Sequence, residues 1–225
     1  MKPNRIILIR HGESEGNVDK NIYGVKPDYA LELTEKGLEQ ARQAGEKLRN
    51  IIQDETARFY ISPYWRTRST FEQVAGQLRR EQFSYVEEPR IREQEWGHLR
   101  ELELGKQVEQ QRDEFGVFYY RLPDGESAAD VFDRVSDFFG TLHRDFEKPH
   151  YPQNTVIVTH GMAIRLFLMR WYHWTVEEFE LLANPSNCEL FVMEKQHNGK
   201  YTINHPIRRH DMVYHPYQRP VKFQD

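Results

Sequence analysis

The sequence predicts an α/β protein of three layers, in which a mostly parallel central sheet carries helices on both faces. Short runs of branched apolar residues alternate with longer segments of helical periodicity. Two of these apolar runs stop abruptly at the dipeptide His-Gly, as a strand does when the backbone turns at the edge of a sheet. The 225 residues contain no repeat, linker or low-complexity segment, which favours a single domain over residues 1–225.

The first half of the chain contains two predicted strand–helix pairs. Residues 5–10 are mostly branched and apolar, which is typical of a strand buried on both faces of a parallel sheet. Residues 34–52 repeat apolar and small side chains at helical spacing, with Thr34 placed as the N-cap. A second strand is expected over residues 58–61, and a helix over residues 67–78 follows it.

The second half repeats this pattern. Ser127 precedes a helical apolar face that ends at Phe146, and Asp130 is placed to reach back to the cap. Residues 155–159 are another predicted buried strand, and a helix that extends to Trp171 follows it. Two further elements follow, a short helix with a capping box at residues 175–178 and a strand at residues 189–195.

Composition indicates a globular protein without a strongly charged surface. Hydrophobic residues make up 38%, charged residues 29%, and the net charge is -4. We therefore expect no nucleic-acid partner, because such surfaces normally carry a basic excess. The apolar runs are too short to span a bilayer and the start resembles no signal peptide, so we expect a cytoplasmic protein without a membrane partner. The single cysteine, Cys188, is expected to be a buried small hydrophobe.

Two histidines lie where two predicted strands end. His11 belongs to the motif Arg10–Gly12, and His160 belongs to the motif Thr159–Gly161. Because the carboxyl ends of parallel strands meet at the edge where open α/β folds bind ligands, we expect both histidines to meet. Either histidine alone would more often be an ordinary hydrogen-bonded residue, but the pair favours a functional site. In both motifs a glycine follows and lets the amides beyond it point at an anion.

The residues around the first histidine favour a phosphate group. Arg10 and Arg66, which follows the second strand, would each bring a planar guanidinium that matches two phosphate oxygens. The loop at residues 12–17 adds small hydrogen-bonding groups, among which Ser14 and Asn17 are candidate phosphate ligands. This loop lacks the spacing of a Walker phosphate-binding loop.

Together these motifs resemble the histidine phosphatase superfamily, in its phosphoglycerate-mutase-like branch. The resemblance spans roughly residues 5–195. It rests on Arg10–Asn17, Ser62-Pro63 with Arg66, Ile91–Glu93 followed by Trp96-Gly97, and Thr159–Gly161. Within the superfamily, Arg92–Gln94 followed by Pro123–Ser127 is most similar to plant mutase-like proteins and a fungal broad-range acid phosphatase.

The resemblance implies an acid-type phosphatase that needs neither metal nor cofactor and acts on small-molecule phosphate monoesters. His11 would attack phosphorus and become a phosphohistidine that water later hydrolyses. Arg10, Arg66 and His160, with Asn17, would hold the phosphate oxygens. A neutral His11 beside a cationic His160 would require the pocket to move their two pKa values apart.

Glu93 is implied as the acid that protonates the leaving group and then activates water. Its sequence neighbours Glu87, Glu88 and Glu95 compete for this assignment, and Glu13 is the runner-up.

Residues 98–126 are expected to form an insertion over the pocket, where loops usually set specificity. Arg121 in this insertion and Gly161 after the second histidine are further candidates for substrate binding. Aromatic residues such as those at 115–120 more often pack in a hydrophobic core than surround a ligand. Their position in the insertion nevertheless predicts that some of them lie over the pocket. Residues 206–225 form a tail that the pattern does not assign.

The spacing of His205, His210 and His215 does not match the usual pairing of metal ligands, so no metal site is expected there.

Two alternatives stay open, a phosphoglycerate mutase and a phosphate-sensing or protein-binding module without turnover. Hydrolysis is favoured because the stretch 118–121 reads Phe-Tyr-Tyr-Arg, where the mutases have an adjacent arginine pair. Arg112 or Arg100 could fold back to replace the missing cation. A binder has no need of a leaving-group acid such as Glu93. The oligomeric state is not predicted.

Overall fold

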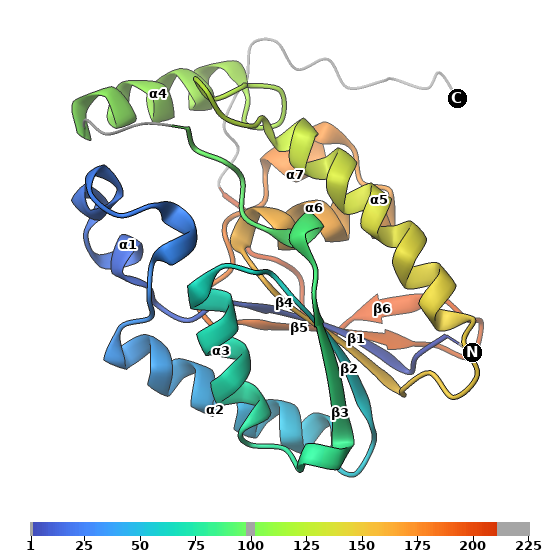
Figure 1. The fold of residues 1–225 in the computed structure, drawn as a ribbon. Helices are drawn as coiled ribbons and strands as arrows, with labels where there is room; N and C mark the ends of the chain where they lie inside the picture. The colour runs from blue at the N-terminus through green and yellow to red at the C-terminus, as the bar shows by residue number, and fades with distance from the viewer. Residues whose placement is uncertain (1, 98–101, 211–225) are drawn as a thin grey trace, which may run out of the picture.

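A six-stranded sheet lies at the centre of the computed structural model, which describes residues 2–97 and 102–210 (Figure 1). The strands are ordered β3-β2-β4-β1-β5-β6. The first four in the chain run parallel, whereas β5 is antiparallel to β1 and β6 is antiparallel to β5. The bounds are β1 (Arg5–Arg10), β2 (Ala57–Ile61), β3 (Phe83–Glu87), β4 (Asn154–Thr159), β5 (Leu190–Lys195) and β6 (Tyr201–Ile203).

Alternate side chains of β1 point to opposite faces of this sheet. Ile6 and Leu8 belong to a core shared with helices α5 (Ala128–Phe146) and α6 (Gly161–Tyr172). Ile7 and Ile9 belong to a second core, shared with α2 (Glu35–Ile52) and α3 (Trp65–Ala75). All four β1 side chains are fully buried. The predicted three-layer α/β architecture is therefore confirmed, as Figure 1 shows.

The predicted helix caps are present. The hydroxyl of Thr34 accepts the amide of Gly37 at 3.0 Å at the start of α2. Ser127 and Asp130 form the expected capping box of α5, with the Ser127 amide donating to Asp130 at 2.7 Å. Thr175 caps α7 (Val176–Glu180).

The predicted bounds of one helix are wrong. The helix expected over residues 67–78 is α3, Trp65–Ala75. It begins earlier because the hydroxyl of Thr67 donates to the carbonyl oxygens of Ser62 and Tyr64, at 2.9 and 2.7 Å. A threonine that bonds back to the preceding turn lies inside a helix rather than at its cap.

Several elements were not predicted. Strand β3 is an edge strand with mostly exposed side chains, so it lacks the apolar run of the central strands. The expected insertion contains α4, which Figure 1 shows above the sheet. The remaining elements are α1 (Glu15–Val18), α4 (Leu102–Phe115), η1 (Lys20–Gly24), η2 (Asp28–Ala30), η3 (Arg80–Gln82), η4 (Pro89–Ile91) and β6.

Two of the predicted segments lie partly outside the described residues. Residues 98–101 of the insertion, which include Arg100, and residues 211–225 of the tail, which include His215, are among them. In the described part of the tail, Arg209 forms a β-bridge with Leu182. None of the helices in the described part of the chain is both long and apolar enough to cross a membrane.

Candidate active site

The register of β1 and β4 brings two histidines together. Arg10 lies opposite Thr159 as the last pair of the two parallel strands, and each is followed by a histidine. The amide of His11 extends the ladder by donating to the carbonyl oxygen of Thr159 at 2.9 Å. The rings of His11 and His160 then meet edge to face with centroids 5.2 Å apart.

The hydrogen bond made by Nδ1 of His11 leaves Nε2 of the same ring free. Its Nδ1 lies 2.7 Å from the carbonyl oxygen of Gly12. A carbonyl oxygen only accepts, so Nδ1 carries the proton and Nε2 keeps its lone pair. Burial lowers the pKa of His11 well below the ordinary histidine value, and the cations Arg66 and Arg10 lower it further. His11 is therefore a buried, neutral imidazole at neutral pH.

His160 is fully buried and has one ring nitrogen without a partner. Its Nε2 lies 2.7 Å from the hydroxyl of Ser62, whereas no described residue hydrogen-bonds to its buried Nδ1. Burial lowers the pKa of His160 well below the ordinary value, and Arg66 and then His11 contribute further. The same burial and the same arginine thus lower both pKa values, and the separation of the two values stays a prediction.

Arg10 also has a buried hydrogen-bond donor without a partner among the described residues. Its Nη1 donates to the carbonyl oxygen of Pro185, but its Nε is buried and unpaired within residues 2–97 and 102–210. Gly161 lies against it, since a Cβ there would stand 3.7 Å from that Nε and 2.7 Å from Oδ1 of Asn184. A side chain at position 161 would therefore collide with Asn184, whereas its contact with Arg10 would be an ordinary one.

Arg66 projects from the first turn of α3 and is buried. Its Nη1 donates to Oδ1 of Asp28 at 2.9 Å and to the carbonyl oxygen of the same residue at 2.6 Å. The guanidinium carbon lies 4.9 Å from the ring centre of Tyr64, whose ring also packs on His160. Asp28, which sequence analysis did not single out, thus holds Arg66 at the histidine pair.

Glu93 differs from the runner-up Glu13 in its surroundings. The backbone amide of Gln94 donates to Oε1 of Glu93 at 3.0 Å, and burial raises the pKa of this carboxyl above the ordinary value. The carboxylate of Glu13 binds Lys36 at 2.7 Å and Thr34 at 3.0 Å. These contacts lower the pKa of Glu13, so Glu93 is the better proton donor.

Two of the other glutamates near Glu93, the exposed Glu87 and the buried Glu88, are engaged in ion pairs. Glu87 pairs with Arg68 at 2.7 Å, and Glu88 pairs with Arg90 at 2.6 Å.

The architecture and motifs agree with the comparisons to known proteins. The family model described as the histidine phosphatase superfamily (branch 1) matches residues 6–205. The chain belongs to the histidine phosphatase superfamily.

Two curated relatives match most of the chain's length. It is 46% identical over 214 residues to phosphoglycerate mutase-like protein AT74 of Arabidopsis thaliana, covering 89% of this chain and 68% of the relative. It is 31% identical to the broad-range acid phosphatase DET1 of Saccharomyces cerevisiae, covering 86% of each chain.

Among solved structures, a mycobacterial glucosyl-3-phosphoglycerate phosphatase aligns with a TM-score of 0.70 over 92% of this chain and 100% of that chain. The two sequences are 19% identical, so this likeness supports the fold alone.

The loop after His11 is fixed by amide hydrogen bonds. Oδ1 of Asn17 accepts the Ser14 amide and Nδ2 of Asn187, both at 3.1 Å. Asn187 also donates to the carbonyl oxygen of His11 at 3.2 Å. Ser14 is buried and Asn17 is exposed. With its oxygen engaged, Asn17 has its NH₂ group as the donor available to a ligand.

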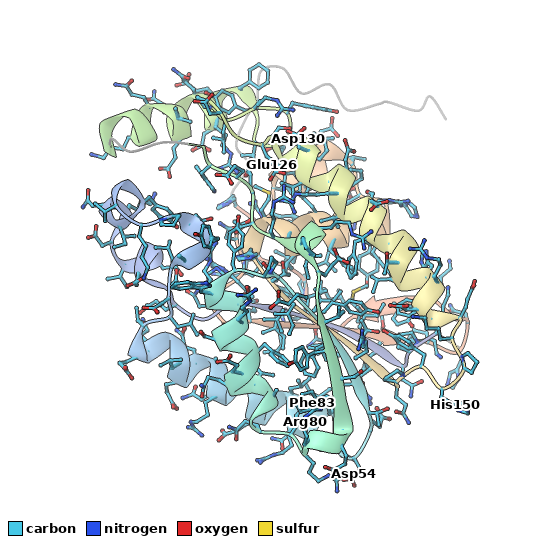
Figure 2. The ribbon with its side chains drawn as sticks, viewed as in Figure 1. Asp54, Arg80, Phe83, Glu126, Asp130 and His150 are labelled. Carbon is cyan, nitrogen blue, oxygen red and sulfur yellow. The ribbon has the colours of Figure 1, made fainter. Side chains whose placement is uncertain are left out.

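The loop that carries Glu93 is held by Arg134 of α5. Its guanidinium donates to three carbonyl oxygens, those of Arg90, Arg92 and Glu93, at 2.7, 2.9 and 3.0 Å. It also pairs with Glu126 at 2.9 Å, which Figure 2 labels near the start of α5. Sequence analysis missed Arg134 because no local pattern connects it with a loop 41 residues away.

Arg121 lies apart from the other predicted site residues. Its Nη2 pairs with Asp130 at 2.6 Å and its Nη1 donates to the carbonyl oxygen of Gly125 at 3.2 Å. The side chain is 63% exposed. The structure therefore places Arg121 in a surface ion pair at the start of α5, and it does not bring this residue to the histidines.

The aromatic residues of the insertion divide between core and surface. Phe118 is buried against Phe132 and Phe179, whereas Phe115 and Tyr119 are exposed.

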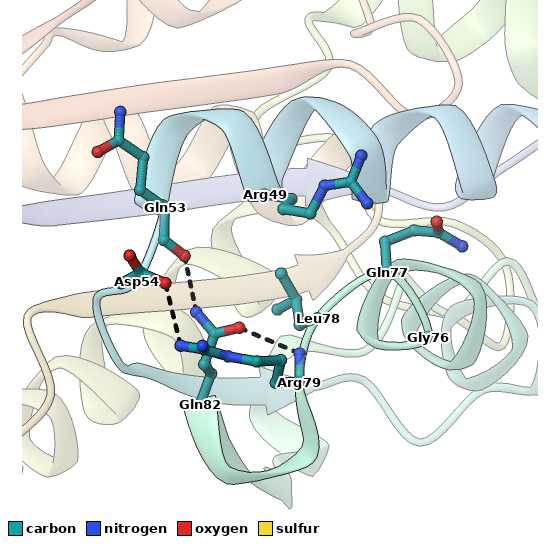
Figure 3. A pocket seen from close by; sticks show the side chains of 8 residues that line it. All are labelled: Arg49, Gln53, Asp54, Gly76, Gln77, Leu78, Arg79 and Gln82. Atoms are coloured by element: carbon teal, nitrogen blue, oxygen red, sulfur yellow. Dashed lines mark hydrogen bonds and ion pairs between the residues drawn. The ribbon is translucent and has the colours of Figure 1, made fainter.

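A depression lies between the ends of α2 and α3, and the histidines are not among its lining residues (Figure 3). Arg79 and Asp54 form an ion pair across it at 3.0 Å, and Nε2 of Gln82 donates to the carbonyl oxygen of Gln53 at 2.7 Å. Figure 2 shows Asp54 at the far end of the protein from Glu126 and Asp130.

No cluster of three or more potential metal ligands occurs among the described residues.

Proposed function

We propose that this protein hydrolyses phosphate monoesters through a phosphohistidine on His11, with Glu93 as the acid and base. The observation that carries the proposal is a buried, neutral imidazole whose free Nε2 lies among two arginines and a second histidine. A histidine in this state is a nucleophile, and cationic neighbours attract a phosphate dianion.

The first step forms one bond and breaks one. The lone pair on Nε2 of His11 attacks phosphorus in line, and the bond between phosphorus and the ester oxygen breaks. Protonated Glu93 gives its proton to the leaving oxygen, so an alcohol departs rather than an alkoxide. Burial supports this role because it raises the pKa of Glu93 and keeps a larger fraction protonated.

The second step returns His11 to its starting state. A water molecule attacks phosphorus while the Glu93 carboxylate takes one of its protons, and the bond from phosphorus to Nε2 breaks. Inorganic phosphate leaves, and Glu93 is protonated for the next turnover.

The unpaired donors of the pocket would stabilise the transferred group. Nε of Arg10 and Nδ1 of His160 are buried without a described partner, which is costly unless a ligand accepts from them. A phosphate oxygen is such an acceptor, and its negative charge would raise the pKa of His160 and favour its cationic form. Arg66 would add a guanidinium, and Asn17 an amide, to the remaining oxygens.

The pKa directions support an acid-type enzyme. His11 remains neutral below the ordinary histidine range because its pKa is lowered, and Glu93 remains protonated above the ordinary glutamate range because its pKa is raised. Both groups are therefore in the reactive form at mildly acidic pH. The name of the yeast relative, broad-range acid phosphatase, agrees with this proposal.

Hydrolysis of p-nitrophenyl phosphate in the presence of EDTA tests the proposed function. We expect turnover by the wild type at full rate after exhaustive chelation, because the arginines supply the charge that a metal supplies elsewhere. His11→Ala is the control for contaminating phosphatases. Turnover that disappears with EDTA and returns with a divalent ion would overturn the metal-independent mechanism, and no turnover at all would favour a binding module.

Transfer to water, rather than to a sugar acid, is tested with 3-phosphoglycerate and a catalytic amount of 2,3-bisphosphoglycerate. We expect release of inorganic phosphate in excess of 2-phosphoglycerate. Rapid isomerisation with negligible phosphate release would reassign the protein as a mutase and leave His11 as the nucleophile.

A further inference from the structure

The acid Glu93 lies in a segment that has no regular secondary structure of its own. Residues 92–97 follow η4 and belong to no helix or strand. Among the described residues, the hydrogen bond that the Glu93 carboxyl accepts comes from the backbone amide of Gln94, at 3.0 Å. The position of the carboxyl therefore follows the backbone of its own segment, and contacts that hold this backbone also hold the acid.

Arg134 of α5 holds this backbone with every donor that its guanidinium has. Nη1 donates to the carbonyl oxygens of Arg90 and Arg92, and Nη2 donates to that of Glu93. The remaining donors reach the carboxylate of Glu126, from Nε at 3.0 Å and from Nη2 at 2.9 Å. These five hydrogen bonds match the five N–H groups of an arginine. The side chain is 11% exposed.

Glu126 binds the same segment through its backbone as well as its carboxylate. Its Oε2 accepts the amide of Glu95 at 3.0 Å, and its carbonyl oxygen accepts Nε2 of Gln94 at 2.7 Å. Burial raises the pKa of Glu126, but Arg134, the amide of Glu95 and Arg92 together outweigh burial and lower it. The carboxylate therefore stays ionised and paired at mildly acidic pH, where both reactive groups of the pocket are in their active forms.

Helix α5 supports these contacts without help from the ion pair. Val131, Val135 and Phe138 of this helix are fully buried in the core, and burial of such an apolar face fixes a helix in place. The desolvation of a largely buried ion pair offsets much of its attraction. Stability of the fold alone therefore does not account for the pair of Arg134 and Glu126.

A second contact on the segment ends before the acid. Oγ1 of Thr159 donates to the carbonyl oxygen of Ile91 at 2.6 Å, which ties the end of η4 to β4. This contact does not reach Glu93. Among the described residues, Arg134 is the one whose side chain bonds to the backbone of the acid itself.

We propose that Arg134, paired with Glu126, is a positioning residue that holds the Glu93 carboxyl at the leaving-group oxygen and so determines how well esters of poor leaving groups are cleaved. The inference rests on the proposed function, in which Glu93 is the acid. A proton donor must lie within hydrogen-bond reach of the atom that it protonates. Esters whose leaving group needs no proton do not depend on this placement.

The leaving-group dependence of the phosphorylation step tests this role. In single-turnover measurements, Arg134→Met should slow phosphorylation of His11 by glycerol 3-phosphate roughly 10²-fold, the effect of a misplacement of about 1 Å. Phosphorylation by p-nitrophenyl phosphate should change far less, because its leaving group needs little protonation. Arg134→Lys keeps the charge with fewer donors and should recover part of the loss.

Arg92→Met is the matched control. Arg92 binds the same carboxylate of Glu126 at 2.8 Å and is 36% exposed, but its side chain donates to Pro89 rather than to the backbone of Glu93. Its loss should leave the ratio of the two phosphorylation rates unchanged. A ratio that falls as far in Arg92→Met as in Arg134→Met would overturn the inference.

A double variant separates positioning from a general structural effect. Because Arg134 acts through Glu93, adding Arg134→Met to Glu93→Gln should slow phosphorylation by glycerol 3-phosphate no further. A merely structural arginine would lower both substrates in proportion, and its loss would add to that of Glu93→Gln. Either of these two results would overturn the inference.

Failure of the proposed function gives a different result. If Glu93→Gln alone slows both substrates equally, Glu93 is not the acid, and the proposed function fails at that residue whatever the Arg134 variants do. If Arg134→Met does not fold, as circular dichroism would reveal, Arg134→Lys decides the question, and a wild-type ratio of the two rates in that variant would overturn the inference.

Discussion

Two regions of this protein collect polar and charged residues, and they differ in how those residues are satisfied. At the carboxyl edge of the sheet, Arg10 and His160 direct buried nitrogens to no described partner. In the depression between α2 and α3 (Figure 3), Arg79 pairs with Asp54 and Gln82 donates to a backbone carbonyl oxygen. The first region retains buried polar atoms without a described partner, whereas Arg79, Asp54 and Gln82 of the second are paired.

Burial explains why unpaired polar atoms are costly in one region and not in the other. The side chains of Asp54 and Arg79 are 92% and 59% exposed, so water solvates what the protein does not. His160 is fully buried and His11 nearly so, and a buried donor without an acceptor costs about 1–3 kcal/mol. The two regions thus differ in what they offer a ligand, because buried polar atoms without a described partner remain at the histidines.

The largest effect should come from removing the nucleophile. His11→Ala should lower kcat by on the order of 10⁴–10⁶, because a missing covalent nucleophile leaves only binding and electrostatics. Steady-state hydrolysis of p-nitrophenyl phosphate measures the loss. Inorganic phosphate should still protect the variant against thermal unfolding, since the arginines remain. Retention of near-wild-type turnover would refute the assignment of His11.

Replacing the proton donor should give the next largest effect. Glu93→Gln should slow the phosphorylation step with alkyl phosphates by roughly 10²–10⁴, but with p-nitrophenyl phosphate far less, because a good leaving group needs little protonation. Single-turnover kinetics isolate this step from dephosphorylation. Glu13→Gln is the matched control, since that carboxylate is bound to Lys36. Equal losses for both substrates would transfer the acid role to another residue.

The pH dependence of activity should report the two groups whose pKa values are shifted. The pKa of His11 is lowered by burial, so activity should persist below the ordinary histidine range and fall only when His11 is protonated. The pKa of Glu93 is raised by burial, so activity on alkyl phosphates should fall as pH rises above the ordinary glutamate range. The kcat/KM profile of the free enzyme measures both limbs.

Asp28→Asn should move one limb of that profile. The negative charge of Asp28 contributes to raising the pKa of Glu93, so its removal should shift the basic limb to lower pH. The acidic limb, which belongs to His11, should move less, because Asp28 is not among the causes that shift it. A basic limb that stays in place would show that Asp28 serves only to hold Arg66.

The smallest effect should come from the depression between α2 and α3. Arg79→Met should change the free energy of unfolding by about 0–1 kcal/mol, as expected for an exposed ion pair, and leave kcat/KM unchanged. Urea denaturation and p-nitrophenyl phosphate hydrolysis measure the two quantities. A large loss of activity would contradict the distinction between the two regions.

The parts of the site that follow strand ends could be predicted from the sequence. Residues 5–10 and 155–159 have the apolar pattern of buried strands, and the register of the two strands then requires His11 and His160 to be neighbours. Thr34 and Ser127 were recognisable as caps for the same reason, since a cap is a local pattern. Periodicity and capping involve residues close together in the sequence.

Contacts between distant segments could not be predicted in this way. Asp28 binds Arg66 from 38 residues away, and Arg134 holds the Glu93 loop from 41 residues away. Arg121 was expected at the pocket, but it binds Asp130, nine residues further along the chain, at the surface. The pKa directions also required the structure, because burial is their largest cause and depends on the whole fold.

A trapped intermediate tests the central claim most directly. Wild-type enzyme is mixed with a ³²P-labelled monoester and quenched within milliseconds, and the labelled protein is digested and sequenced by mass spectrometry. A phosphohistidine on His11 predicts a label that is stable in base, is lost in acid, maps to the peptide containing Arg10 and His11, and is absent from His11→Ala. A label that survives acid, or that maps to another residue, would contradict the mechanism.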